Sequence, residues 1–175
     1  MNKSDSIYPY VVAFILVVFG VVMRLSEHPF NFTPVLAICM FSGICFYNRK
    51  YLLAVPLIMM LVSDYFIGFH GLIPWIYAPL AVCLFVGVAV RKSLNGYTVL
   101  YSSILCSIIF FLVSNFGVWI VGYPKTFEGF ISCYIMALPF FKNTLIGTVA
   151  YSYVFLYLYS LLTTRTLVLK KIINQ

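Results

Sequence analysis

The sequence predicts an all-α integral membrane protein, a single bundle of six transmembrane helices. Of its 175 residues, 63% are hydrophobic and 9% are charged, and the mean hydropathy is +1.05. A soluble domain carries roughly 25% charged residues, so this chain has too few to cover a water-facing surface. Its apolar residues form long continuous runs that suit helices of about 20 residues. The short alternating segments of a transmembrane β-barrel are not seen.

Six apolar runs define the expected helices. They cover 8–23, 33–47, 52–69, 74–90, 98–122 and 143–163. The first run is followed by Arg24-Leu25-Ser26-Glu27 and not by a small-x-small cleavage site, so it is expected to stay in the protein as a helix.

Two prolines mark the start of the second helix and the segment that precedes the last helix. The second helix is short and begins with Thr33-Pro34, where proline suits the first turn. A segment at 129–141 is interrupted by Pro139, which breaks the helical hydrogen-bond pattern. That segment is either a half-buried or re-entrant piece, or the outer end of one long kinked helix.

The basic residues predict the orientation of the bundle. Eight of the eleven Lys and Arg residues fall on one side of the expected helices: Lys3, Arg49, Lys50, Arg91, Lys92, Arg165, Lys170 and Lys171. The other three, Arg24, Lys125 and Lys142, fall on the opposite side. Because cytoplasmic loops carry the excess of Lys and Arg, both termini are expected in the cytoplasm. A bacterial cytoplasmic membrane is the expected location.

Asp64 is the acidic residue that lies deepest in an apolar run. Twelve residues into its helix, it sits about 18 Å from the inner edge, in the outer half of the membrane. A charge at that depth is costly and is a functional-site hypothesis by default. Its expected partner is Arg24, His28 or Lys142; a structural ion pair and a proton carrier both remain open.

Asn115, Trp119 and Tyr123 lie four residues apart near the outer end of the fifth helix, on one helical face. An amide, an indole and a phenol on one stripe can hydrogen-bond to a flat ligand and stack on it. The alternatives are an amide that joins two helices and an aromatic belt at the membrane interface.

Two further polar clusters lie on the same side of the membrane. The first outer loop, Arg24 to Pro34, contains His28, Asn31 and Thr33, and would either cap a cavity or simply connect two helices. The second cluster, Pro139 to Thr144, contains Lys142 and Asn143; Lys142 would meet an anionic ligand or extend to the interface. An outward-facing solute site is therefore expected from Arg24, His28, Asn31, Thr33, Asp64, Asn115, Trp119, Tyr123, Lys142 and Asn143.

Several classes of function are disfavoured. The chain has no P-loop and no HExxH zinc helix. With four acidic residues and two histidines, it offers no paired carboxylates and no metal cluster, so neither an enzyme nor a bound cofactor is expected. The scattered basic residues do not form a nucleic-acid surface. The five cysteines, Cys39, Cys45, Cys83, Cys106 and Cys133, are expected as free packing thiols.

Four motifs together resemble a known family. They are Arg24 with His28-Pro29 and Asn31-Phe32-Thr33-Pro34, the Ser63-Asp64 pair, Ser114-Asn115-Phe116-Gly117-Val118-Trp119, and Pro139-Phe140-Phe141-Lys142-Asn143-Thr144-Leu145. Between Arg24 and Tyr151 the chain resembles an uncharacterised family of small bacterial membrane proteins described as putative transport proteins.

That family is similar in layout to the S components of energy-coupling-factor vitamin transporters. The resemblance implies six helices, a pocket near the outer face, a small and vitamin-like solute, and a shared transmembrane scaffold with ATPases as partner. Many S components carry a small-xxx-small motif in their first helix, whereas Ala13 and Gly20 here are seven residues apart.

The expected function is therefore membrane transport or substrate binding for a small solute. The first alternative is a non-transporting accessory subunit of a membrane complex. The second is an intramembrane enzyme that acts on a lipid, for which Asp64 with His28 or Lys142 is the candidate catalytic pair.

Overall fold

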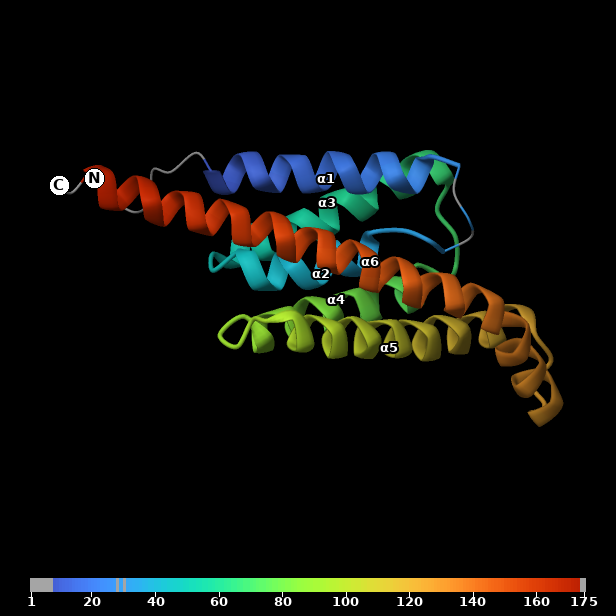
Figure 1. Cartoon of the computed structure of the whole chain (residues 1–175). Helices are drawn as coiled ribbons and strands as arrows, with labels where there is room; N and C mark the ends of the chain where they lie inside the picture. The colour runs from blue at the N-terminus through green and yellow to red at the C-terminus, as the bar shows by residue number, and fades with distance from the viewer. Residues whose placement is uncertain (1–7, 28, 30, 174–175) are drawn as a thin grey trace.

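The computed structural model describes residues 8–27, 29 and 31–173, and within them the chain forms six α-helices. In chain order they are α1 (Tyr8–Leu25), α2 (Val35–Cys45), α3 (Arg49–Ile67), α4 (Ile73–Val90), α5 (Gly96–Gly122) and α6 (Phe127–Ile173). Figure 1 shows them packed side by side in one bundle.

Four of these helices are long and apolar enough to cross a membrane. The qualifying stretches are Lys50–Ile67, Ile73–Val90, Gly96–Gly122 and Phe127–Leu162. Two shorter apolar stretches, Tyr10–Leu25 and Val35–Cys45, complete the set. The predicted class, an all-helical membrane-type bundle, is confirmed at this level.

The short helix α2 lies at the centre of the bundle. It contacts each of the other five helices, and ten of its eleven residues are buried. Eleven residues span only about 16 Å, because an α-helix rises about 1.5 Å per residue. The helix starts after Pro34 and ends at Cys45, before the extended residue Phe46, inside the predicted range of 33–47.

A close helix crossing joins α2 to α4 through two glycines. A Cβ atom added to Gly43 would lie 2.1 Å from the Leu84 carbonyl oxygen, and one added to Gly87 would lie 1.9 Å from the Met40 carbonyl oxygen. Small residues allow helix backbones to approach in this way in membrane bundles. Both positions therefore require glycine.

The last helix differs most from its predicted extent of 143–163. The segment at 129–141 is no separate piece: it belongs to a single helix from Phe127 to Ile173, with Pro139 inside it. Figure 1 shows that the start of α6 bends away from the long remainder, as expected where proline removes a backbone donor. Hydrogen bonds from Cys133 and Tyr134 to carbonyl groups of α5 hold this first part in place.

The start of α5 also lies earlier than the predicted residue 98. Asn95 and Thr98 form a reciprocal capping box, with both side-chain-to-backbone distances at 2.9 Å. This cap satisfies two amide groups that a helix end leaves open.

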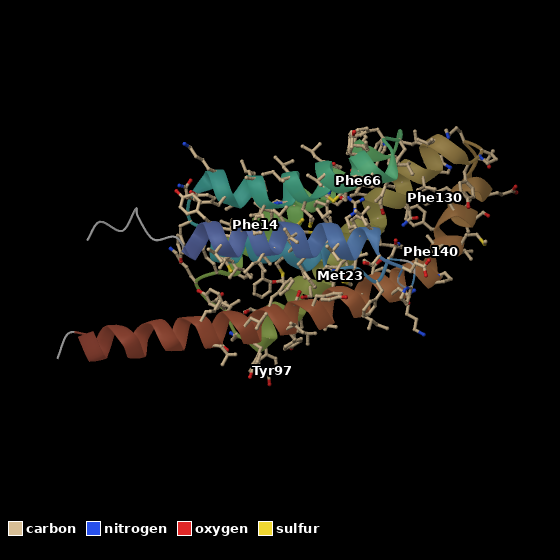
Figure 2. The ribbon with its side chains drawn as sticks, turned by 90° about the horizontal axis from the view of Figure 1, so that it is seen from above. Phe14, Met23, Phe66, Tyr97, Phe130 and Phe140 are labelled. Carbon is tan, nitrogen blue, oxygen red and sulfur yellow. The ribbon has the colours of Figure 1, made fainter. Side chains whose placement is uncertain are left out.

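We call the end of the bundle where α1, α3 and α5 finish, and where α2, α4 and α6 begin, the Arg24 end. Figure 1 places the first residues of α1 and the last residues of α6 together at the opposite end. The side-chain view in Figure 2 places Phe66, Phe130 and Phe140 toward the Arg24 end, with Tyr97 toward the other.

Candidate functional site

The ion pair of Arg24 and Asp64 joins α1 to α3 at the Arg24 end. Arg24 Nη2 lies 2.7 Å from Asp64 Oδ1, and the two side chains are 14% and 2% exposed. Of the three partners that the sequence left open for Asp64, the structure therefore selects Arg24. A carboxylate this deeply buried needs such a partner, because an unpaired buried charge is very costly.

Neighbouring groups complete a hydrogen-bonded network around this pair. Arg24 Nη1 donates to Ser63 Oγ, and Ser63 Oγ donates in turn to the Met59 carbonyl at 2.7 Å. The hydroxyl of Tyr77 donates to Asp64 Oδ2 at 2.7 Å. Because Tyr77 belongs to α4, the network fastens three helices together.

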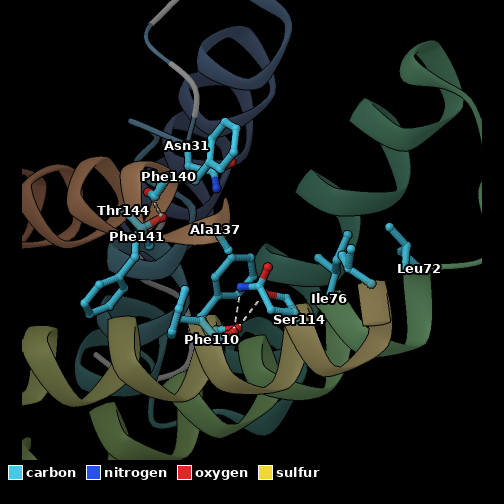
Figure 3. Close-up of a pocket in the computed structure, with 12 residues that line it drawn as sticks. Asn31, Leu72, Ile76, Phe110, Ser114, Ala137, Phe140, Phe141 and Thr144 are labelled. Atoms are coloured by element: carbon cyan, nitrogen blue, oxygen red, sulfur yellow. Dashed lines mark hydrogen bonds between the residues drawn. The ribbon is translucent and has the colours of Figure 1, made fainter. Parts of the chain in front are cut away.

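A cavity of about 200 Å³ also lies at the Arg24 end, and none of the network residues lines it. Its aromatic walls are Phe110, Phe111, Phe140 and Phe141. Its aliphatic lining is Leu72, Ile76, Val118 and Ala137. Its polar lining is Asn31, Ser114, Asn115 and Thr144. Figure 3 shows Asn31, Phe140 and Thr144 on one side of the cavity, with Phe110 and Ser114 on the other.

Three of the four polar residues are held rigidly by the helices that carry them. Ser114 Oγ donates to the Phe110 carbonyl at 2.6 Å, and Thr144 Oγ1 donates to the Phe140 carbonyl at 2.9 Å. Asn115 Nδ2 donates to the Phe111 carbonyl at 2.8 Å. Each side chain bonds to the residue four positions earlier, which fixes its orientation.

Asn31 reaches the cavity from the loop between α1 and α2. Its backbone is left-handed, with φ of 62°, in a turn closed by a 2.9 Å hydrogen bond from Phe32 N to the Pro29 carbonyl. Asparagine tolerates this conformation better than most residues. A non-glycine residue held there suggests a function when it also lines a cavity.

A continuous series of aromatic contacts runs from the start of α4 along the second half of α5 and the first part of α6, and it ends at the cavity wall. Neighbouring rings along it have centroids 4.7–5.6 Å apart, in the order Trp75, Phe116, Trp119, Phe130, Tyr134, Phe111 and Phe141. The last two line the cavity. These ring contacts thus make the cavity wall part of a rigid aromatic cluster.

Trp119 lies in the last turn of α5 and Tyr123 directly follows the helix, and neither residue lines the cavity. Trp119 Nε1 donates to the Pro124 carbonyl at 3.0 Å, and Tyr123 is the C-terminal cap of the helix. Lys125 Nζ donates to the carbonyls of Trp119, Ile120 and Tyr123. A lysine there offsets the partial negative charge of the helix end.

The remaining predicted residues lie around the rim or outside the described part of the chain. Thr33 is half-buried; it precedes Pro34, the N-cap of α2, where no side-chain cap is formed. Lys142 is exposed and Asn143 is half-buried, and neither is among the cavity-lining residues. His28 lies outside the described residues.

The cavity also contains residues that the sequence analysis did not select. Phe111 and Ser114 are the clearest, since each lies within one helical turn of Asn115. The predicted stripe follows four-residue steps from Asn115 toward the end of α5. One such step toward the start of the helix leads to Phe111. Thr144 lies inside the predicted Pro139 to Thr144 cluster but was not singled out.

The described residues contain no group of three or more His, Cys, Asp or Glu side chains that could hold a metal ion. All five cysteines are free, as predicted.

The fold and this site define a membrane-type helical bundle with a buried ion pair and a cavity at one end. Residues 4–170 match a family described as a family of unknown function, DUF6580, and the chain belongs to that family. Neither the curated proteins nor the solved structures contain a match to the chain.

Proposed function

We propose that this protein is a carrier or substrate-binding subunit for a small solute, with the cavity at the Arg24 end as its binding site. The observation that carries the proposal is the convergence of Asn31, α4, α5 and α6 on one cavity with aromatic walls and fixed polar groups. Concave, mostly apolar sites with a few placed polar groups are typical of small-molecule binding.

We further propose that the six-helix bundle lies across a bacterial cytoplasmic membrane, with the Arg24 end outward. The distribution of eight basic residues against three supports this orientation. Helix α1, with 18 residues, is about 27 Å long and nearly matches a hydrocarbon core of about 30 Å. The short α2 needs no full span of its own, because the surrounding helices cover it.

The size of the cavity supports a small solute. A cavity of about 150 Å³ is enough to bind benzene, so about 200 Å³ accommodates a single ring with a substituent. If the protein docks on a shared transporter scaffold, the contact uses a face of α1 other than that of Gly20, since Gly20 packs against Met59 and Ile38 inside the bundle.

The proposal is tested by mass spectrometry of small molecules that co-purify with the protein in mild detergent. We expect a compound that the wild type retains and that Asn115→Ala loses, because Asn115 supplies a fixed polar contact in the cavity. Ser107→Ala is the matched control: Ser107 lies on the same helix and makes the same kind of backbone bond, but does not line the cavity.

A compound retained equally by the wild type, Asn115→Ala and Ser107→Ala would contradict the cavity as the binding site. A stable complex with other membrane proteins and no bound compound would instead favour the accessory-subunit alternative.

A further inference from the structure

We infer that the cavity selects a neutral, ring-sized solute that donates hydrogen bonds through an N–H or O–H group. This inference rests on the proposed function and names the chemical class that the same site would take. It follows from the charges, hydrogen bonds and walls of the cavity.

The first step concerns charge. None of the described residues that line the cavity is ionisable. The nearby Arg24 and Asp64 neutralise each other, and neither lines the cavity. A carboxylate, phosphate or ammonium group in this cavity would lose part of its hydration against the apolar walls and gain no opposite charge from the lining, which is unfavourable.

The second step concerns the direction of the hydrogen bonds. A backbone carbonyl can only accept, so the hydroxyl hydrogens of Ser114 and Thr144 must point to the Phe110 and Phe140 carbonyls. The two hydroxyl groups then have no hydrogen left for a ligand. What each can still offer is the lone pairs of its oxygen, so both act as acceptors.

The same reasoning orients the amide of Asn115. Its Nδ2 lies 2.8 Å from the Phe111 carbonyl, and a flipped amide would place two acceptor oxygens against each other. Oδ1 is thereby left without a hydrogen bond among the described residues, as a third acceptor, and the second N–H of Nδ2 can still donate, so the three oriented side chains offer three acceptors and one donor. The amide of Asn31 can donate or accept, so acceptors predominate.

The third step concerns shape. Phe111 and Phe141 contact each other, with centroids 4.7 Å apart, and form one wall of the cavity. Such aromatic surfaces favour a planar ring that packs by an offset or edge-to-face contact. A flat molecule with an amide, urea or ring N–H group meets both requirements.

Four benzene derivatives of nearly identical shape test this inference. Benzamide is a neutral donor, acetophenone is neutral without a donor, benzoate is an anion and benzamidinium is a cation. Their affinities for the purified full chain in detergent are measured by ligand-observed NMR. We expect benzamide to bind most tightly and acetophenone at least about tenfold more weakly, because a site built to pair with a donor rejects its isostere.

Two variants locate the binding. Ser114→Ala removes one acceptor and is expected to weaken benzamide binding about threefold or more, whereas Ser107→Ala on the same helix leaves it unchanged. Equal or tighter binding of acetophenone, benzoate or benzamidinium, with the same dependence on Ser114, would overturn the donor class while keeping the solute site. If none of the four compounds binds, or if Ser114→Ala changes nothing, the cavity assignment itself fails, and the inference fails with it.

Discussion

Charged and neutral polar residues have separate roles at the Arg24 end. Arg24 of α1 and Asp64 of α3 form an ion pair inside the bundle, and each is the principal partner of the other. The neutral residues Asn31, Ser114 and Asn115 line the cavity instead. The sequence predicted Arg24 both at the solute site and among the possible partners of Asp64, and in the structure its guanidinium contacts Asp64 and Ser63.

The ion pair makes a prediction that separates structure from binding. Asp64→Asn or Arg24→Gln alone is expected to destabilise the protein by about 3–5 kcal/mol, because each leaves one buried charge without its partner. The double variant Arg24→Gln with Asp64→Asn should be less destabilised than the sum of the two, since no charge then remains. Thermal unfolding in detergent measures all three against the wild type.

Additive losses in that double-mutant cycle would show that the two charges do not interact. Benzamide binding serves as the control, because neither residue lines the cavity. A folded double variant is expected to keep its affinity.

At the scale of the helix, α2 and α4 cross at a distance that brings their backbones into contact. Met40 and Gly43 of α2 meet Leu84 and Gly87 of α4 by direct contact of backbone atoms. Helix α4 and its N-cap Leu72 place Leu72 and Ile76 in the cavity lining and Tyr77 beside Asp64. Movement of α4 would therefore change the cavity and the ion-pair network together.

Substitution at either glycine of this crossing should separate the two helices. We expect Gly43→Ala and Gly87→Ala each to destabilise the protein by about 1–3 kcal/mol, the range for overpacking a tight core. The effect should lie at the upper end of that range, because the added methyl group meets backbone atoms rather than a movable side chain. Thermal unfolding in detergent is again the measurement.

Gly122→Ala is the matched control for this pair. It lies in α5, and an added Cβ there would meet no atom within 4 Å. A small gain in stability is expected from the better helix propensity of alanine. Equal effects at Gly43, Gly87 and Gly122 would contradict the close crossing of α2 and α4.

At the scale of the whole molecule, apolar length predicted the helices well because a chain in lipid must satisfy its backbone hydrogen bonds internally. Apolar composition does not distinguish a helix inside the bundle from one that faces lipid: α2 is buried on all sides, yet its composition resembles that of a lipid-facing helix. The course of α6 depended on packing against α5, through Cys133 and Tyr134, which Pro139 alone does not reveal. Two cavity residues were predicted: Asn115, because polar residues are rare in apolar runs, and Asn31, because it lies in a polar outer loop. Its aromatic walls were not found, because phenylalanine is common throughout this chain.

The orientation of the whole bundle is the last property to test, and single cysteines placed at its two ends can do so. Ser93 and Glu128 are both exposed and lie at opposite ends, in the turn before α5 and in the first turn of α6. A membrane-impermeant thiol reagent should label Glu128→Cys in intact cells but label Ser93→Cys only after permeabilisation, because the excess of basic residues places the Ser93 end in the cytoplasm. The wild type is the control, since four of its five cysteines are buried and the fifth, Cys45, is only partly exposed. The reverse labelling pattern would turn the cavity toward the cytoplasm and make it a site for solutes that are already inside the cell. Labelling of both variants in intact cells would contradict the proposed membrane-spanning arrangement itself.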